Sequence, residues 1–407
     1  MVTGFGAVTP VGNDRESTWR ALLAGRTGVG PITRFDASGL PTRIAAEVED
    51  FDPAALLDRK RERRSARFSQ LAVAAAREAC DDAGLALGDD GIDARRVGVV
   101  LNSAVAGMDR VEASAVAMRT VPRGVSAYFV SSVIPNMAAC EVAIDIGARG
   151  PVTAGALACA SGVHALLEAR RLILSGEADV VVAGGTDAAI TPVMFAGLCA
   201  MGVLSRRNDE PSRASRPFDA DREGFVFGEG SVVCVMESAE HARARGARAY
   251  AEVAGGALTS DAFHVSAPDP SGAGAATAME QALDAAGVAA DDVDCICAHG
   301  TGTRVNDLLE TRAIRQVYGG HAYHLAVSSP KSMTGHLIGA AGTLSAMVGA
   351  LAMRDGLVPP TINLDRPGEE CDLDYVPHTA RGIRVRAAVV NAFGFGGQNC
   401  VAVLKAL

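Results

Sequence analysis

The chain has 407 residues, of which 49% are hydrophobic, 21% are charged and only 4% are aromatic. This apolar content is enough for a large buried core, which excludes a mostly disordered chain. A net charge of −9 argues against nucleic-acid binding through bulk charge. Nine cysteines are too few and too irregularly spaced for a disulfide framework, and no apolar run reaches the ~20 residues of a membrane helix. With no secretory signal in the sequence, we expect a cytoplasmic protein without a membrane or nucleic-acid partner.

Short β-branched runs alternate with longer helical patterns along the chain. Strands are expected at 97–101, 179–183, 231–236, 250–253, 294–298, 325–328, 385–391 and 399–404. Helices are expected at 69–83, 161–174, 274–286, 308–317 and 339–353. Continuous apolar strands alternating with amphipathic helices predict an α/β architecture whose sheets are covered on both faces. The stretch 205–230 has no periodicity, and a loop of this length is typical of a functional segment or a cap over a site.

Cys159 stands between an apolar run and a predicted helix, in the sequence GALACASGVHALLEARR. The small residues that follow it, Ala160, Ser161 and Gly162, predict a sharp turn that places the thiol at the helix N-terminus. There the helix dipole and the free N–H groups are expected to stabilise a thiolate and lower the pKa of the thiol. The alternative is a buried structural cysteine, which is the commoner fate of a free cysteine.

Two later strands run into polar turns, at the edge of the sheet where α/β proteins bind ligands. His299 follows the first of these strands, with the hydroxyls of Thr301 and Thr303 beside it. Lys331 and His336 follow the second strand and are five residues apart. The alternatives are a loop histidine, a surface lysine and a helix-capping histidine.

The segment 391–399, NAFGFGGQN, interleaves three glycines with Phe393 and Phe395 between two predicted strands. Such a loop offers backbone N–H donors and can move, although a glycine-rich hairpin is the simpler interpretation. A thiol, two imidazoles and backbone N–H donors at one sheet edge together favour acyl transfer with carbanion chemistry.

With these motifs the chain resembles the β-ketoacyl-acyl-carrier-protein synthases of the thiolase-like superfamily. The resemblance covers essentially the whole chain and is nearest to the synthase II type. This family includes the ketosynthase subunit of type II polyketide synthases. The motifs that carry it are ACASG (158–162), VAGGTDAA (182–189), SRPFDADREGFVFGEG (215–230), AHGTGT (298–303), KSMTGHLIGAAG (331–342), PPTINLD (359–365) and NAFGFGGQN (391–399). It implies a thiolase-like five-layer αβαβα sandwich built from two similar halves. Residues 1–245 would carry the nucleophile, and residues 246–407 would carry the His/Lys/His groups and the gating loop.

The resemblance implies a decarboxylative Claisen condensation. Cys159 would take the acyl chain from the phosphopantetheine of a carrier protein. The backbone N–H groups of Cys159 and Phe395 would form the oxyanion hole, and Gly394 and Gly396 would allow Phe395 to act as a gate.

The remaining assignments also follow from the resemblance. His299 and His336 would stabilise the enolate left when the malonyl carboxylate departs as CO₂. Lys331 would orient the site electrostatically, paired with Glu310. The other implied contacts are support from Asn391, pantetheine binding by Thr301, Thr303 and Ser266, and an acyl pocket that includes Leu198, Met108 and Ile134. No organic cofactor or catalytic metal is needed, and the family pattern leaves room for a structural cation near Asn306, Glu310 or Asn391.

A basic strip on this acidic chain would dock an acidic acyl carrier protein. The residues proposed for it are Arg59, Lys60, Arg63, Arg64 and Arg67, together with Arg206 and Arg207 in the long loop. The alternative is a solvated helix face. The second implied partner is another subunit, either a further copy of this chain or a catalytically dead chain-length-factor homologue.

Some segments depart from the synthase II pattern. NSAVAG at 102–107 and SVIP at 132–135 look closer to polyketide ketosynthases, whereas KSMTGH and SGVHALLEA look closer to fatty-acid synthase II. Leu198 stands where a gating aromatic often stands. We favour a polyketide role, with a housekeeping fatty-acid synthase II homodimer as the alternative. A non-catalytic partner subunit is disfavoured by the intact Cys159, and a thiolase would need a second catalytic cysteine near the C-terminal loop.

Overall fold

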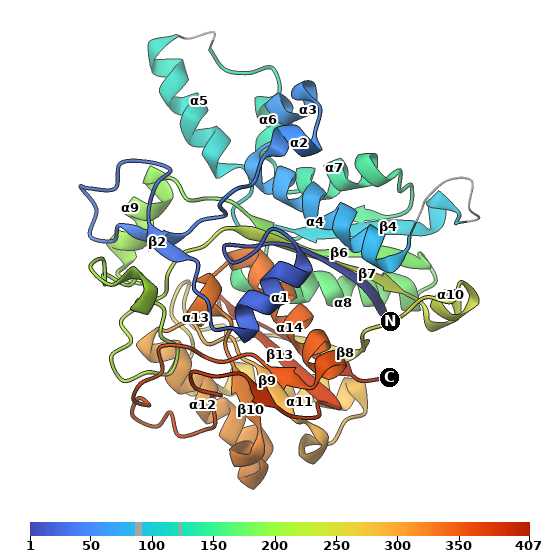
Figure 1. Cartoon of the computed structure of the whole chain (residues 1–407), viewed down its shortest axis with the longest axis vertical. Coiled ribbons are helices and arrows are strands. Elements are labelled where there is room, and N and C mark those ends of the chain that lie inside the picture. Colours follow the sequence, from blue (N-terminus) through green and yellow to red (C-terminus); the bar gives the residue numbers. More distant parts are fainter. Residues whose placement is uncertain (86–91, 122–123) are drawn as a thin grey trace.

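The computed structural model describes residues 1–85, 92–121 and 124–407, and it contains two five-stranded sheets with helices between and outside them (Figure 1). The strand order is β1-β7-β6-β4-β5 in the first sheet and β10-β9-β13-β14-β8 in the second. The strands of the first sheet are β1 (Val2–Val8), β4 (Val97–Asn102), β5 (Val152–Thr153), β6 (Val180–Asp187) and β7 (Gly230–Glu237). The strands of the second sheet are β8 (Glu252–Ser260), β9 (Cys295–Cys297), β10 (Ala326–Ser328), β13 (Ala387–Gly394) and β14 (Gln398–Lys405).

The two sheets are built to the same plan. From β1 across the first sheet, the pairings are antiparallel, antiparallel, parallel and parallel. From β8 across the second sheet, the succession is the same. This repetition agrees with the prediction of two similar halves, although the sequences of the halves show little similarity.

Helices form three layers around the two sheets, as Figure 1 shows from top to bottom. The central layer consists of α8 (Ser161–Leu174) and α14 (Ala341–Asp355), which contact each other and both sheets. The outer layer on the first sheet contains α4 (Arg67–Ala83) and α7 (Met137–Ile146). The outer layer below the second sheet contains α11 (Ala273–Ala286) and α12 (Arg304–Tyr318). The predicted five-layer αβαβα sandwich is therefore confirmed.

The starts of the two central helices approach each other closely. A Cβ atom on Gly162 would lie 2.7 Å from the backbone nitrogen of Thr343, and one on Gly342 would lie 2.6 Å from that of Val163. Only glycine permits this contact without moving the backbone. Because Cys159 immediately precedes α8 and His336 shortly precedes α14, the contact brings both residues to one place.

The other elements lie mainly at the periphery. The remaining helices are α1 (Arg15–Leu23), α2 (Pro53–Leu56), α3 (Arg59–Arg64), α5 (Met108–Thr120), α6 (Phe129–Val133), α9 (Pro192–Met201), α10 (Ala239–Ala244) and α13 (Lys331–Thr334). Two short hairpin-like sheets pair β2 (Val29–Pro31) with β3 (Ile44–Ala46) and β11 (Leu357–Val358) with β12 (Arg381–Gly382). No helix in the described ranges is long and apolar enough to cross a membrane.

The predicted elements differ from the observed ones mainly at their ends. The strand expected at 250–253 begins at Glu252 and continues to Ser260. The helix expected at 339–353 begins at Ala341, after a 3₁₀ turn at Ile338–Ala340. The stretch 205–230 is irregular as predicted, apart from a 3₁₀ turn at Pro211–Arg213 and the first residue of β7.

Candidate active site

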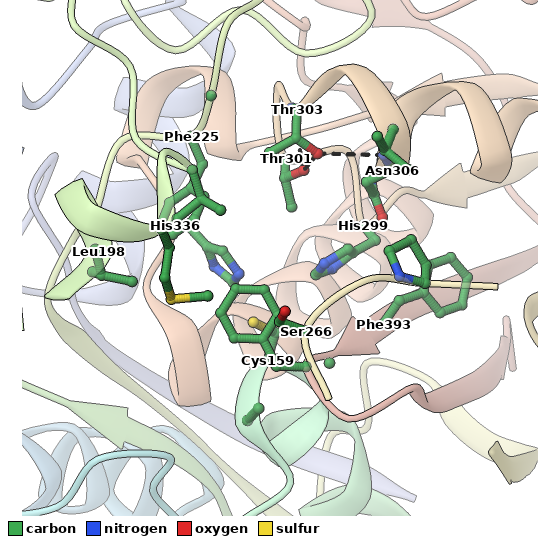
Figure 2. A pocket seen from close by; sticks show the side chains of 18 of the residues that line it. Cys159, Leu198, Phe225, Ser266, His299, Thr301, Thr303, Asn306, His336 and Phe393 are labelled. Atoms are coloured by element: carbon green, nitrogen blue, oxygen red, sulfur yellow. Dashed lines mark hydrogen bonds between the residues drawn. The ribbon is translucent and has the colours of Figure 1, made fainter. Parts of the chain in front are cut away.

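A cavity of about 720 Å³ is lined by residues of both halves and collects most of the residues predicted for catalysis, the gate and pantetheine binding (Figure 2). The predicted residues that line it are Cys159, Leu198, Ser266, His299, Thr301, Thr303, Asn306, His336, Gly394 and Phe395. Residues that the sequence analysis did not assign also line it, among them Ala104, Val105, Met194, Phe225, Phe227, Ile338 and Phe393. Phe225 and Phe227 belong to the irregular 205–230 stretch, so this stretch forms part of the site wall. The signal that could have placed them is the Phe/Gly composition that 224–230 shares with 391–397.

Cys159 lies in a 3₁₀ turn, Ala158–Ala160, that leads directly into α8 at Ser161. Burial raises the pKa of the thiol to about 11, while the charge of Lys331 and the N–H groups of Cys159 and Phe395 oppose the rise. The expected lowering of this pKa is therefore wrong, because desolvation outweighs the helix N-terminus and the lysine. The same two N–H groups lie near the sulfur, beside the position that the carbonyl oxygen of a Cys159-bound acyl group would take, as an oxyanion hole requires.

Two imidazoles face this thiol (Figure 2). The Cys159 sulfur and one ring nitrogen each of His299 and His336 all lie within 4.8 Å of one another. The two rings are 5.5 Å apart between centroids, with their planes at 80°. Burial, together with the nearby Lys331 charge, holds the pKa of both histidines well below the usual value. Both rings are therefore neutral at pH 7.

His336 presents a hydrogen-bond donor to the cavity. The backbone N–H of Ile338 donates to its Nδ1 at 3.2 Å, so the proton of the neutral ring is on Nε2. Nε2 is buried and has no hydrogen-bond partner in the described part of the chain. An N–H aimed into the cavity suits a carbonyl or enolate oxygen. It disfavours a metal ion on Cys159, His299 and His336, since a metal-bound histidine donates from its other nitrogen.

Lys331 is the first residue of α13 and is 3% exposed. Its ammonium group donates to the backbone carbonyl of His299 at 2.5 Å. Burial lowers the pKa of Lys331 to about 8, and the Glu310 carboxylate opposes this shift. The predicted pairing of Lys331 with Glu310 is wrong as a direct contact, because no ion pair within 4.0 Å joins these two described residues. The Glu310 carboxylate instead acts on the Lys331 ammonium group by electrostatic attraction, from the other side of the His299 turn.

Glu310 and Asn391 brace this turn from behind. The Glu310 carboxylate accepts from the N–H groups of His299 (2.8 Å) and Gly300 (2.7 Å) and from the Asn391 side chain (3.0 Å). The predicted supporting role of both residues agrees with these contacts. The structural cation proposed near Asn306, Glu310 or Asn391 stays a prediction. The Asn306 amide N–H donates to Asp307, and the Asn391 Oδ1 is buried without a hydrogen-bond partner in the described part of the chain.

The residues predicted to contact pantetheine all line the cavity. The hydroxyls of Thr301 and Thr303 are 3.0 Å apart. The Thr303 hydroxyl also accepts from the backbone N–H of Asn306 and so caps α12, as the dashed line in Figure 2 shows. Ser266 is the third of these lining residues, on the segment that follows β8.

The Gly/Phe segment connects β13 to β14 beside Cys159. Phe395 is 37% exposed and lines the cavity. Gly396 and Gly397 have φ angles of +86° and +73°, which other residues rarely adopt. Gly394 comes so close to the Cys159 turn that a Cβ atom on it would lie 2.8 Å from the Leu157 carbonyl oxygen.

Of the three residues assigned to the acyl pocket, one lines the cavity and two do not. Leu198 on α9 lines the cavity. Met108 lies behind this wall, packed against the apolar cluster that contains Leu198, and is not among the described lining residues. Ile134 is 38% exposed at the end of α6, on the surface of the chain rather than in the cavity. Sequence motifs locate a segment but do not show which of its side chains point inward.

The basic strip is only partly available to a partner. Exposed side chains are those of Arg59, Lys60, Arg63, Arg64 and Arg206. Arg67 pairs with the buried Glu229 at 2.9 Å and its side chain is 18% exposed, so its assignment to docking is wrong. Arg207 is half-buried and pairs with Glu210 at 3.3 Å.

Two family models match the sequence. The Beta-ketoacyl synthase N-terminal domain matches residues 1–242, and the Beta-ketoacyl synthase C-terminal domain matches residues 250–365. Among curated relatives, the 3-oxoacyl-[acyl-carrier-protein] synthase 2 of Coxiella burnetii is 48% identical, over 100% of this chain and 98% of the relative. That of Synechocystis sp. is 46% identical, over 100% of this chain and 97% of the relative.

Solved structures of the same fold include polyketide enzymes. The ishigamide ketosynthase/chain length factor superposes with a TM-score of 0.93 at 36% identity, covering 100% of this chain and 98% of that one. The AntDE:AntF complex, a type II acyl-carrier protein with its ketosynthase bound to the hexaketide, gives 0.92 at 32% identity and the same coverage. Sequence and structure agree that the chain belongs to the β-ketoacyl synthase family.

Proposed function

We propose that the protein is a β-ketoacyl-acyl-carrier-protein synthase that extends a Cys159-bound acyl chain by decarboxylative condensation with malonyl-carrier protein. One observation carries the proposal: a thiol at a helix start converges with two neutral imidazoles, one of which presents an N–H to the cavity. This set can acylate a thiol and stabilise an enolate without a metal or organic cofactor.

The first half-reaction loads the chain. The Cys159 sulfur attacks the carbonyl carbon of an acyl thioester, and its proton passes to the departing pantetheine thiolate. The negative charge that develops on the carbonyl oxygen is stabilised by the N–H groups of Cys159 and Phe395, which lie near the sulfur that carries the chain. The raised pKa of Cys159 keeps the sulfur protonated until an acyl thioester arrives.

The second half-reaction forms the carbon–carbon bond. The malonyl thioester carbonyl accepts from His336 Nε2–H and from His299, the bond to the carboxylate breaks, and CO₂ leaves its electron pair in the enolate. The enolate carbon attacks the acyl carbonyl, and the tetrahedral intermediate expels the Cys159 thiolate, which takes up a proton from solvent. Lys331 holds the His299 turn through its carbonyl and adds positive charge beside the developing enolate.

Two features support a partner subunit. The strand β5 is the edge of the first sheet and pairs only with β4 in the described chain. Around it, α5, α6 and α7 expose a set of large apolar side chains: Val111, Val116, Met118, Tyr128, Val130, Ile134, Ile144 and Val152. An apolar surface beside an open strand edge is typical of a subunit interface, and Ile134 belongs to it. We infer a dimer, either of two copies or with a chain-length-factor homologue, acting in the cytoplasm on an acyl carrier protein.

The pathway has two candidates, each favoured by a specific observation. The identity of 48% and 46% to two 3-oxoacyl-[acyl-carrier-protein] synthases 2 favours fatty-acid synthesis by a homodimer. The NSAVAG and SVIP segments, together with Leu198 in the acyl pocket, favour a polyketide role in a heterodimer.

The competing classes fit the site less well. A thiolase would place a second reactive cysteine in the cavity, but Cys400 is fully buried in β14 and burial raises the pKa of its thiol far above the usual value. A non-catalytic partner subunit would have no use for a thiol held between two neutral imidazoles.

Co-expression of the protein with the products of its neighbouring genes, followed by intact mass measurement of the carrier-bound acyl chains, tests this function. We expect chains that lengthen by two carbons per condensation, and none from a Cys159→Ala variant. Products that require the chain-length-factor homologue would establish the heterodimer. Chain lengthening by the Cys159→Ala variant would refute the proposal.

A further inference from the structure

Asp187, the last residue of β6, is fully buried and lies at the base of the site. Its carboxylate oxygen Oδ1 accepts from the Ser103 hydroxyl (2.6 Å) and the Val105 N–H (3.1 Å). The other oxygen, Oδ2, accepts from the N–H groups of Ala104 (3.0 Å) and Gly339 (2.7 Å). Four donors from two segments far apart in the sequence therefore converge on one side chain.

The two segments serve different parts of the cavity. Ala104 and Val105 line its acyl side, where Leu198 also lies. Gly339 follows Ile338, which lines the cavity as well and whose N–H binds His336. The carboxylate thus joins the acyl pocket to the turn that orients an imidazole. A side chain on Gly339 would lie 2.4 Å from Oδ2, so this contact also requires glycine.

The turn at Ile338 is strained. Ile338 has a φ angle of +51°, a left-handed conformation that is a rare outlier for a β-branched residue. Such a conformation persists only where the surrounding structure imposes it. The hydrogen bond from Gly339 to Asp187 is the adjacent contact that holds the turn, and in this turn the Ile338 N–H points at Nδ1 of His336.

We propose that Asp187 is a positioning residue that holds the strained Ile338–Gly339 turn, so that His336 keeps its proton on Nε2, and that ties this turn to the acyl-pocket wall. The inference rests on the proposed function only for its effect on catalysis. The effect on the His336 tautomer follows from the contacts alone.

Because Ala104 and Gly339 share the acceptor Oδ2, filling the acyl pocket affects decarboxylation at His336. An acyl chain that presses on Ala104 changes how firmly Oδ2 holds Gly339, because the N–H groups of Ala104 and Gly339 share this acceptor. Decarboxylation at His336 therefore responds to whether, and how far, the acyl side of the pocket is filled.

The test compares Asp187→Asn with the wild type in two measurements. In ¹⁵N-histidine-labelled protein, we expect the His336 signals to move from a single Nε2–H tautomer to a mixture of tautomers. We also expect malonyl decarboxylation to fall by about tenfold or more, with self-acylation changed less, because only decarboxylation uses the Nε2 proton. Ser103→Ala removes one donor to the same carboxylate and should shift both readouts less, in the same direction. If Asp187→Asn does not fold, the His336 tautomer and the decarboxylation rate of Ser103→Ala test the inference by themselves.

Glu237→Gln is the matched control. Glu237 is likewise a fully buried carboxylate, at the opposite end of the same sheet, and it binds His241 and Arg245 rather than the site. It should lower stability without moving the His336 tautomer.

The double variant Asp187→Asn/Ile338→Gly provides a rescue. Glycine adopts a positive φ without strain, so it should restore part of the Nε2–H population. An unchanged His336 tautomer in Asp187→Asn and Ser103→Ala would overturn the inference. A shifted tautomer with no effect on decarboxylation would support the positioning role and contradict the proposed use of His336.

Discussion

A single methyl group on Gly394 should disable the oxyanion hole. Gly394 precedes Phe395, whose N–H is one of the two donors proposed for the oxyanion hole. The backbone of Gly394 is not in the left-handed region. An alanine here is therefore conformationally allowed, and its effect is purely steric. Its Cβ atom would lie 2.8 Å from the Leu157 carbonyl oxygen and 3.4 Å from the Cys159 nitrogen.

The size of the effect follows from these distances. Ordinary van der Waals contact begins near 3.4 Å, so the loop and the Cys159 turn must separate by about 0.6 Å. An oxyanion donor works at about 2.7–3.1 Å, and a displacement of this size takes it out of range. Loss of one such donor lowers kcat by about 10²–10³, or about 2.7–4 kcal/mol. We expect this loss in self-acylation, with the KM for acyl-carrier protein changed little.

The assay is rapid-quench intact mass measurement of acyl-enzyme formation, with thermal unfolding measured in parallel to exclude a folding defect. Gly396→Ala is the control in the same loop. Its φ of +86° makes alanine strained, but its Cβ would meet only the Gln398 side chain at 3.7 Å. This variant should slow the motion of the 391–399 loop without displacing Cys159. Wild-type acylation by a folded Gly394→Ala variant would refute the assignment of Phe395 N–H to the oxyanion hole.

Three further predictions concern the imidazole, the thiol and the docking surface. His336→Ala should block malonyl decarboxylation more than self-acylation, and unchanged CO₂ release would remove its role. Because burial raises the pKa of Cys159 to about 11, its thiolate is scarce at pH 7, so alkylation by iodoacetamide should accelerate about tenfold per pH unit towards pH 8. Above pH 8 the slope should fall as Lys331 loses its proton, and a rate already constant from pH 6 would contradict the raised pKa. Arg63→Glu/Arg64→Glu should raise the KM for carrier protein without loss of stability. Arg67→Glu should instead destabilise the fold, because it places a second carboxylate beside the buried Glu229 and leaves Arg34 as the one remaining arginine paired with it. An unchanged KM in the first variant would favour a solvated helix face.

The sequence predicted the fold class correctly, and it also named the thiol and the two imidazoles that the structure brings together. Cys159 and His299 each follow an apolar run and precede a small or polar turn. His336 lies in the polar segment that follows the strand predicted at 325–328, and the structure retains all three arrangements. The strand and helix periodicities also persist, because continuous apolar runs must be buried wherever they lie.

The errors concern properties set by distant residues. The thiol pKa depends on how completely the second half of the chain buries Cys159, which a helix-start pattern does not reveal. Arg67 belongs to a basic run, but its partner Glu229 is 162 residues away. The link from Asp187 to Gly339 spans 152 residues, and it was invisible until the fold brought them together.

The central claim is that Cys159 carries the acyl chain that the enolate attacks. The most direct measurement is a single turnover: acyl-enzyme is mixed with malonyl-carrier protein, quenched at intervals, and digested for mass measurement of the Cys159 peptide and the carrier-bound product. The account predicts that the adduct leaves the Cys159 peptide at the rate at which a β-ketoacyl chain two carbons longer forms, with one CO₂ released per chain. An adduct on another residue, or CO₂ release that leaves the Cys159 adduct in place, would contradict it.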